Sequence, residues 1–278
     1  MKKTLLYTFM VTFLVSLISC KDLTKGQNSS NITNPKTVTP AAVVKTVTLK
    51  GKDLKGAELT GLDEQGRRQN FQIRDVELDP LDPENETYLY TVFYQDPADS
   101  KWKNLCTPDA ENVAKAIPLS GSWDDTGSHI ESSDIMTFGC TNGVLAKCVR
   151  FGYKPWKNVQ GKSLRDYHQA CTRMVRADYC GNGKSHTQEG TPIDVYDVLG
   201  IQKPTPNNGM VFEAAWQQDG AICINRPRWF ETVSQIRKEC AEKLKGRINE
   251  DGHCATAQKA RQHWSDSLLF NDSLVRKR

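Results

Sequence analysis

The sequence predicts an α+β protein in which a strand-rich N-terminal part is followed by a disulfide-braced helix and hairpin part. Residues 43–135 contain short segments of alternating apolar and polar residues, separated by Gly, Pro and Asp turns. Residues 136–270 contain apolar residues at helical spacing together with most of the cysteines. Strands followed by helices are typical of α+β proteins, and the two parts form either one domain or two.

Residues 1–19 are predicted to be a lipoprotein signal peptide. Lys2 and Lys3 form a basic start, and the segment 5–18 is apolar. Leu17-Ile18-Ser19-Cys20 then resembles the bacterial lipobox, in which the cysteine accepts a lipid. The alternative is an uncleaved membrane anchor, but the apolar run is short for a span. We therefore expect lipidation of Cys20, which makes the membrane a partner through the N-terminal lipid.

The next segment, residues 20–42, is predicted to be a flexible tether. It consists mainly of Asn, Ser, Thr, Lys and Pro, and so cannot bury enough apolar surface to offset the entropy of ordering. A lipidated cysteine places the protein in the bacterial cell envelope. We expect an outer-membrane anchor with the folded part periplasmic or surface-exposed. Loss of Lys2 and Lys3 lowers the formal charge from +4 to +2, which argues against nucleic acid as a partner.

The strand-rich part begins with a predicted hairpin. Residues 57–62 and 70–73 flank the turn 63–66, and a phase slip at Asp75 predicts a β-bulge. Residues 88–94 form the most regular strand pattern, with three tyrosines and Val92 on one face. That face fits either packing within a sheet or stacking against carbohydrate, and packing is favoured.

Two helices are predicted in the middle of the chain. Leu145, Cys148 and Val149 have the spacing of a short buried helix. Ser163 is a suitable N-cap for a second helix, which the Cys180-Gly181 pair is expected to end.

The C-terminal third is predicted to contain a hairpin and two helices. Asp219-Gly220 lies between two apolar segments and predicts the hairpin turn. Val233, Ile236, Cys240 and Leu244 form one helical stripe that ends before Gly246. A last helix is expected over 253–269.

Eight cysteines remain when Cys20 is set aside: Cys106, Cys140, Cys148, Cys171, Cys180, Cys223, Cys240 and Cys254. An even number in an oxidising compartment predicts four disulfides. Zinc is the alternative, but no C-x2-C pair occurs. Eight cysteines allow 105 connectivities. Only the Cys240–Cys254 pair is predicted, on the basis of nearness in sequence.

Several segments together resemble the bacterial ADYC-domain family, whose name is the tetrapeptide at residues 177–180. The segments are Leu105-Cys106, residues 116–119, Trp123-Asp124, residues 137–143, residues 146–148, residues 168–174, Gly181 and Gly183, residues 185–187, residues 190–194 and residues 213–223. The resemblance covers roughly residues 45–255. It implies a domain found in many predicted lipoproteins, and it implies no particular activity.

The loop 176–197 is the candidate functional segment because turn formers and titratable residues are dense there. His186 with Asp194 and Asp197 could be a general base with orienting acids, and Ser185 or Thr187 would then be the nucleophile. No Gly-x-Ser-x-Gly motif surrounds either hydroxyl. The alternative, that these residues hydrogen-bond a rigid loop, is favoured over catalysis.

Metal and anion sites in the same loop are weaker candidates. Oxygen ligands for calcium could come from Asp178, Asn182, Glu189, Asp194 and Asp197, but the EF-hand spacing is absent. Residues 181–184 fall short of a phosphate-binding loop. We therefore predict no cofactor, with calcium as the alternative.

Two functions remain open at this point. The first is a non-catalytic envelope module that binds an unknown envelope or external partner or has a structural role. The second is an envelope hydrolase that uses the 178–197 loop. An enzyme would expose His186 beside a hydroxyl or a metal, whereas a structural loop would pair its polar groups internally.

Overall fold

The computed structural model describes residues 41–45, 51–63, 66–248, 250 and 252–274. The predicted signal peptide, Cys20 and the tether up to residue 40 lie outside the described residues. All described residues belong to one unit, which spans residues 34–278. Within the described ranges, no helix has the length and apolar character needed to cross a membrane.

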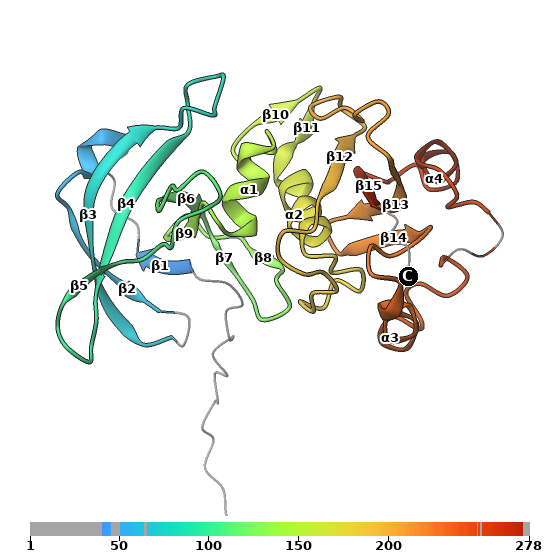
Figure 1. The fold of residues 1–278 in the computed structure, drawn as a ribbon. Helices are drawn as coiled ribbons and strands as arrows, with labels where there is room; N and C mark the ends of the chain where they lie inside the picture. Colours follow the sequence, from blue (N-terminus) through green and yellow to red (C-terminus); the bar gives the residue numbers. More distant parts are fainter. Residues whose placement is uncertain (1–40, 46–50, 64–65, 249, 251, 275–278) are drawn as a thin grey trace, which may run out of the picture. The chain divides into compact units, whose positions relative to one another are not determined.

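The strand-rich part is an antiparallel sheet that closes on itself (Figure 1). Its strand order is β3-β2-β1-β9-β6-β4-β5, and β3 also pairs with β4, so six strands form a closed barrel with β5 attached to β4. The strands are β1 (Ala41–Lys45), β2 (Glu58–Leu62), β3 (Arg68–Leu78), β4 (Tyr88–Gln95), β5 (Trp102–Asn104), β6 (Ala116–Ser120) and β9 (Ile135–Cys140). Closure satisfies the strand edges that an open sheet would leave unpaired.

Local patterns in this part are confirmed. The β2–β3 hairpin forms with Leu62 opposite Arg68, and the β3–β4 register shifts between Ile73 and Asp75, where the bulge was predicted. Tyr90 and Val92 are buried in the barrel core, and Tyr88 and Tyr94 pack against it. The tyrosine face of β4 is therefore a packing face.

Two helices follow the barrel. A 3-10 turn, η1 (Gly51–Leu54), and the two-stranded ribbons β7 (Ser122–Trp123)–β8 (His129–Ile130) and β10 (Asn158–Val159)–β11 (Lys162–Ser163) complete this part of the fold. Helix α1 (Val144–Arg150) buries Leu145, Ala146 and Val149 against β4 and β6 residues of the barrel. Helix α2 (Leu164–Val175) begins at Ser163, whose hydroxyl accepts from Arg165 N at 3.3 Å.

Helix α2 ends earlier than predicted, at Val175 instead of next to Cys180. Ala177 adopts φ +51°, which turns the chain out of the helix. Ala177 N then donates to Met174 O at 3.0 Å and Asp178 N to Arg173 O at 2.9 Å, so the last carbonyls are satisfied. A left-handed alanine is rare, and its position cannot be predicted from helical periodicity.

The second sheet is antiparallel, with strand order β12-β15-β13-β14. Its strands are β12 (Ile193–Asp197), β13 (Met210–Gln217), β14 (Gly220–Ile224) and β15 (Leu269–Leu274). The β13–β14 hairpin confirms the predicted turn. The predicted helix over 253–269 is confirmed only over α4 (Ala257–His263); residues 253–256 form turns, and β15 follows as an interior strand. Residues 269–274 form a strand because they pair with β12 and β13, both of which are distant in sequence.

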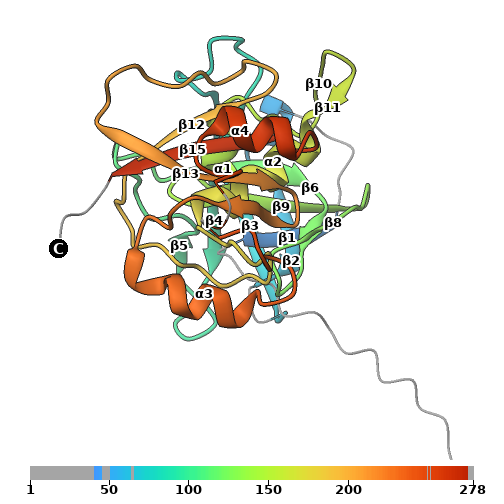
Figure 2. The same cartoon turned by 90° about the vertical axis from the view of Figure 1, so that its right-hand side faces the viewer.

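Helices cover both faces of the second sheet (Figure 2). Helix α2 packs against the face that carries Ala214 and Trp216, and α4 packs against the face that carries Phe212 and Ala215. After the 3-10 turn η2 (Phe230–Thr232), α3 (Val233–Glu239) is shorter than predicted, and turns continue the chain to residue 246. Ile236, Cys240 and Leu244 are nonetheless buried together in the α2-side core, as the stripe predicted.

All eight cysteines predicted to pair form four disulfides: Cys106–Cys140, Cys148–Cys171, Cys180–Cys240 and Cys223–Cys254. The predicted Cys240–Cys254 pair is wrong. Cys240 lies in the core on the α2 face of the second sheet, and Cys254 lies in the core on the α4 face. The sheet separates the two cysteines, so nearness in sequence does not make them neighbours.

Candidate functional site

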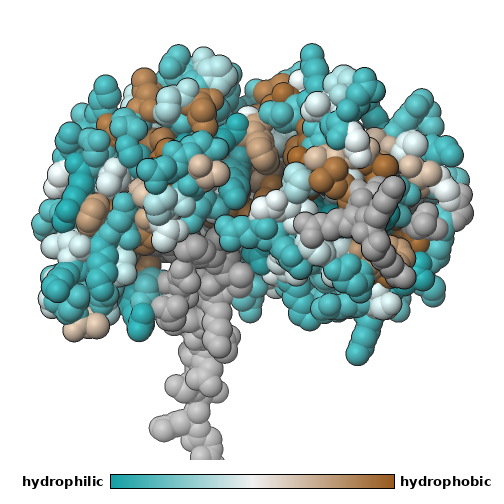
Figure 3. Space-filling view, in the orientation of Figure 1, coloured by the Kyte–Doolittle hydropathy of each residue, from teal (hydrophilic) through white to brown (hydrophobic). Residues whose placement is uncertain are grey.

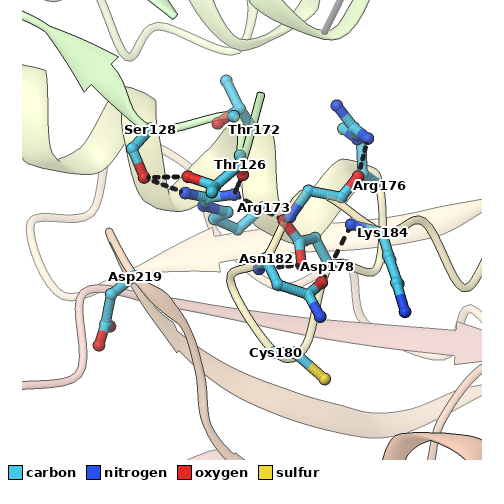
Figure 4. Close-up of polar contacts among 12 residues, drawn as sticks. Thr126, Ser128, Thr172, Arg173, Arg176, Asp178, Cys180, Asn182, Lys184 and Asp219 are labelled. Carbon is cyan, nitrogen blue, oxygen red and sulfur yellow. Dashed lines mark hydrogen bonds and ion pairs between the residues drawn. The ribbon is translucent and has the colours of Figure 1, made fainter. Parts of the chain in front are cut away.

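Asp178 is the centre of the candidate loop (Figure 4). Its buried carboxylate accepts from Asn182 N at 3.1 Å and Gly183 N at 2.9 Å, which closes the turn that follows. Arg173 Nη1 donates to the same carboxylate at 2.6 Å, and both side chains are almost fully buried. A carboxylate with these partners is held by its own loop and is not available to a ligand.

Arg173 extends this network to two other segments. It donates to Ser128 Oγ at 2.7 Å, to Gln218 O at 3.3 Å and to Thr126 O. Figure 4 shows Arg173 between Asp178 and the Thr126–Ser128 turn. Helix α2, the turn after β7 and the β13–β14 turn are thus joined by one guanidinium.

Tyr179 anchors the loop in the core. Its ring stacks on Trp216 with centroids 5.2 Å apart. Its hydroxyl donates to Glu213 Oε1 at 3.0 Å and accepts from Arg228 N at 3.2 Å. Complete burial raises the pKa of Tyr179, so the phenol stays protonated.

The two residues that Tyr179 contacts, Glu213 and Arg228, form a buried ion pair. Arg228 Nη2 lies 2.8 Å from Glu213 Oε1, and both side chains are almost fully buried. The same guanidinium donates to Met174 O at 2.7 Å and Val175 O at 3.2 Å. Arg228 therefore satisfies the last carbonyls of α2, where a positive charge is also favourable for the helix dipole.

The end of the tetrapeptide binds the loop to α3 and to the second sheet. Cys180 pairs with Cys240 at the end of α3. Gly181 has φ +70°, and a Cβ atom there would lie 1.6 Å from Asp219 O. Every residue of Ala177–Cys180 therefore has a structural role, and glycine is required directly after it.

His186 lies inside the protein and is not exposed. Its Nδ1 is 3.2 Å from Ala177 O, and its side chain is 2% exposed. Its Nε2 lies 3.3 Å from Glu239 Oε2, within ion-pair distance but without hydrogen-bond alignment, and neither atom has another partner among the described residues. Ser185 Oγ donates to Arg176 O at 2.9 Å, and Thr187 Oγ1 donates to Gln188 O at 3.4 Å.

The two predicted orienting acids contact other residues. Asp194 accepts from Thr205 N at 2.7 Å and from Asn208 Nδ2 at 3.0 Å. Asp197 accepts from Tyr153 OH at 3.0 Å and from Gln202 N at 2.7 Å. Each carboxylate thus shapes the segment that joins β12 to β13, and no hydrogen bond or ion pair seen among the described residues joins either acid to His186.

The calcium candidates also serve separate parts of the loop. Asp178 is bound by its own turn, Asn182 Oδ1 accepts from Lys184 N at 3.1 Å, and Glu189 is exposed. Across the ranges that the structure describes, no three His, Cys, Asp or Glu side chains gather in a way that could hold a metal ion.

A cleft of about 400 Å³ lies elsewhere, and sequence reasoning missed it. It is formed by the β3–β4 loop, the end of α1, the β10 region and residues 201–202. Figure 3 shows apolar side chains among polar ones in the upper middle of this face, where the β3–β4 loop and the β10–β11 ribbon come near one another in Figure 1.

The cleft combines apolar walls with paired charges. The apolar residues are Leu81, Pro83, Val149, Phe151, Val159, Leu164 and Ile201. The charged residues are three acids and three cations: Asp79, Asp82, Glu84, Arg150, Lys154 and Lys157. Arg150 Nε binds Asp79 at 2.8 Å, and Lys154 Nζ binds Asp82 at 2.8 Å and Glu84 at 2.5 Å. The lining is therefore formally neutral.

The charged side chains that line the cleft shift one another's pKa values. Burial opposes ionisation of Asp82, but hydrogen bonds from Lys154 and from the loop backbone outweigh it, and the pKa of Asp82 is lowered. Hydrogen bonds from Lys154 and Lys157 lower the pKa of Glu84 to about 2. Burial opposes the charge on Lys154 as well, but its carboxylate partners raise the pKa of that amine.

No short motif predicts this cleft, because its walls come from residues between 79 and 202. The Asp79-Pro80 and Asp82-Pro83 pairs indicate only the end of a strand when the sequence is considered alone. In the structure Asp79 accepts from Leu81 N at 3.0 Å and Asp82 accepts from Thr87 N at 2.8 Å, so both acids build the loop. An aspartate before each of two nearby prolines was the available signal for a shaped loop.

Comparison with known proteins identifies one family. A family model described as the ADYC domain matches residues 51–230. The matched range is more than half of the chain and includes both the 176–197 loop and the cleft. No curated protein and no solved structure matches the chain.

Proposed function

We propose that this chain, which belongs to the ADYC-domain family, is a non-catalytic, lipid-anchored binding protein of the bacterial cell envelope. The observation that carries the proposal is the contrast between two regions. The polar groups of the 176–197 loop are largely used within the protein, whereas the cleft near Leu81 is open and has a formally neutral lining. In this proposal the ADYC loop maintains the fold and the cleft binds the ligand.

The chemistry of the cleft favours an uncharged ligand with an apolar group. Its three acids and three cations are paired with one another or with nearby acids, so a charged ligand would have to displace an existing ion pair. The apolar walls can cover an apolar group, and a volume of about 400 Å³ is in the range of small-molecule sites.

The hydrolase alternative has less support. A general base must lie within reach of the hydroxyl that it activates. His186 is buried against Ala177 O and Glu239, and Ser185 donates its hydroxyl proton to Arg176 O. The loop therefore offers no nucleophile and base pair among its described contacts.

Binding of an uncharged apolar probe tests the cleft. N-phenyl-1-naphthylamine should bind the full chain saturably, with one site, and Leu81→Asp should weaken its affinity about tenfold or more, because a carboxylate is costly against an apolar group. Leu62→Asp is the control, since Leu62 is similarly exposed but lies on β2. The sulfonated analogue of the probe should bind more weakly.

Equal probe affinity in the wild type and the Leu81→Asp variant would remove the cleft from the proposal. So would a signal that does not saturate.

The anchor needs a separate experiment. Cys20 is proposed to carry the lipid that holds the folded part at the outer membrane. Globomycin treatment, or the substitution Cys20→Ser, should block maturation and abolish partitioning into the detergent phase. A Cys20→Ser protein that matures and partitions normally would exclude the lipoprotein assignment while leaving the cleft unaffected.

A further inference from the structure

A second hollow, of about 300 Å³, lies on the barrel where β3 begins and β4 turns into β5. It is lined by three side-chain amides, those of Gln69, Asn70 and Gln95, together with Arg68 and Asp96. It shares no residue with the cleft of about 400 Å³. The hollow is therefore a separate candidate for ligand binding.

The three amides are held by hydrogen bonds that leave further polar atoms unused. Gln69 is buried and its Nε2 donates to Gln95 O, which leaves its Oε1 as an acceptor in a residue that lines the hollow. Asn70 Nδ2 donates to Gln95 Oε1 at 3.4 Å, and Gln95 Nε2 donates to Ser100 O at 3.2 Å. No described residue donates to Gln69 Oε1 or to Asn70 Oδ1. Two amide oxygens are thus positioned without a protein partner.

The charged side chains of the hollow are one paired acid and one cation without a partner. Lys103 Nζ binds the carboxylate of Asp96, and this hydrogen bond lowers the pKa of Asp96. Arg68 is exposed, and its guanidinium has no hydrogen-bond or ion-pair partner among the described residues. The hollow therefore combines hydrogen-bond donors on Arg68 with the two amide acceptors.

An aromatic side chain lies beside these polar groups. Trp102, the first residue of β5, is directly opposite Gln95 in the β4–β5 pairing, so both side chains lie on the same side of the sheet. Cβ atoms of directly opposite residues are about 4.5–5.5 Å apart, which places the indole at the margin of the hollow. Trp102 is only partly buried, so part of its surface is accessible to a ligand.

We propose that this hollow binds one sugar unit of a neutral oligosaccharide, with Trp102 stacked against one face of the sugar ring. A sugar hydroxyl both donates and accepts, so adjacent hydroxyls can donate to the amide oxygens of Gln69 and Asn70 and accept from Arg68. The C–H groups on one face of the sugar match the electron-rich face of an indole. An anion would meet two amide oxygens and the Asp96 carboxylate, and an apolar ligand would leave the amides unpaired.

Calorimetric titration of the full chain with cellotetraose and with chitotetraose tests the site. We expect at least one of the two to bind with a dissociation constant of about 1 mM or lower. Arg68→Met and Asn70→Ala should each weaken that affinity about fivefold, the usual effect of losing one hydrogen-bonding side chain. Trp102→Ala should weaken it about tenfold or more, and Trp102→Phe should restore most of the loss because it retains a ring.

Two exposed residues outside the hollow provide the controls. Trp156→Ala and Arg237→Met should bind the sugar as the wild type does. Arg68 and Asn70 are exposed, so thermal melts of their variants should match the wild type. The proposal is overturned if neither tetrasaccharide binds at about 10 mM. Equal affinity in the wild type and in the Arg68 and Asn70 variants would overturn it as well.

The same titration separates this site from the cleft. Leu81→Asp should leave the sugar affinity unchanged, and the sugar should not displace N-phenyl-1-naphthylamine, because the two sites share no residue. Loss of sugar binding in Leu81→Asp would place the sugar in the cleft and would overturn the proposal for the hollow.

Discussion

At the scale of single residues, each of the four residues of the tetrapeptide at 177–180 has a different structural role. Ala177 turns the chain with φ +51°, and Asp178 closes the loop by accepting from two backbone amides. Tyr179 fills the core against Trp216, and Cys180 binds the loop to α3. Because each position is specified by a different physical requirement, structural roles alone account for all four residues of the tetrapeptide.

The glycine after the tetrapeptide provides a first prediction. Gly181→Ala should lower the free energy of unfolding by about 3 kcal/mol or more, because the new Cβ would lie 1.6 Å from Asp219 O in addition to the cost of φ +70°. Gly190→Ala is the matched control. Its φ of +74° is similar but nothing lies within 4 Å, so only about 1–2 kcal/mol should be lost. Urea unfolding measures both, and equal losses would refute the close approach.

His186, the histidine of the loop, provides a second prediction. His186→Ala should destabilise the protein by about 1–3 kcal/mol, because Ala177 O loses its side-chain partner and a buried volume is emptied. Thr187→Ala should change stability by less than about 0.5 kcal/mol, since its hydroxyl donates to the carbonyl of the next residue at the long distance of 3.4 Å. The measurement is a thermal melt with disulfides intact. An unchanged or raised midpoint for His186→Ala would direct the search for a substrate back to this loop.

At the scale of elements, the β3–β4 loop is connected to the end of α1 by buried ion pairs. Arg150 binds Asp79 and Asp109, and Lys154 binds Asp82. The same aspartates Asp79 and Asp82 accept backbone amides of their own loop, so loop shape and helix position depend on one set of charges. Both walls of the cleft are therefore positioned by this network.

The network predicts a dependence of stability on pH. Lys154→Met should cost about 3–5 kcal/mol at pH 7, because the buried carboxylate of Asp82 loses its countercharge. The lowered pKa values of Asp82 and Glu84 mean that this stabilisation is present above the unfolded carboxylate pKa of about 4 and is lost as pH falls through the folded values, about 2 for Glu84. The gap between variant and wild type should therefore shrink between pH 4 and pH 2.

A second lysine serves as the control for that experiment. Lys55 pairs with Asp75 at 2.9 Å, but both side chains are well exposed. Lys55→Met should therefore change stability by less than about 1 kcal/mol at any of these pH values. Equal losses for the two lysine variants at pH 7, measured by urea unfolding, would contradict the role given to the buried pair.

At the scale of the whole described unit, the four disulfides are distributed over successive parts of the fold. One joins the β5–β6 connection to β9 of the barrel, and one joins α1 to α2. The other two join the ADYC loop to the end of α3, and β14 to the segment before α4. The disulfides thus cross-link the barrel, the α1–α2 pair, the ADYC loop and the segment before α4, which limits how far these elements can separate on their own.

The longest disulfide loop should contribute most to stability. Replacing Cys180 and Cys240 together by Ala opens a loop with a sequence separation of 60. The expected loss is about 4 kcal/mol from chain entropy, against about 3 kcal/mol for the Cys148–Cys171 pair with its separation of 23. Urea unfolding measures the losses, and peptide mapping without reduction checks the four pairs. A Cys240–Cys254 peptide in the wild type would refute the connectivity.

Local elements were predictable because their signals lie within a few residues. The turns at 63–66 and Asp219-Gly220, the bulge at Asp75 and the cap at Ser163 depend on backbone preferences of neighbouring residues. The even cysteine count likewise indicated that all eight would pair. The lipobox at Cys20 is a local signal of the same kind, and the assignment based on it stays a prediction.

Tertiary structure decided whatever depends on contacts between distant residues. Closure of the barrel requires β1 to meet β9, and β15 became a strand because β12 and β13 pair with it on both sides. The cysteine partners depend on which face of the second sheet each residue reaches, and the cleft depends on the meeting of a β3–β4 loop with the end of α1. The sequence by itself determined the local turns and periodicities, because backbone and side-chain preferences act over a few residues. The sheet order, disulfide partners and cleft follow from packing energies that exist only when separated segments come together.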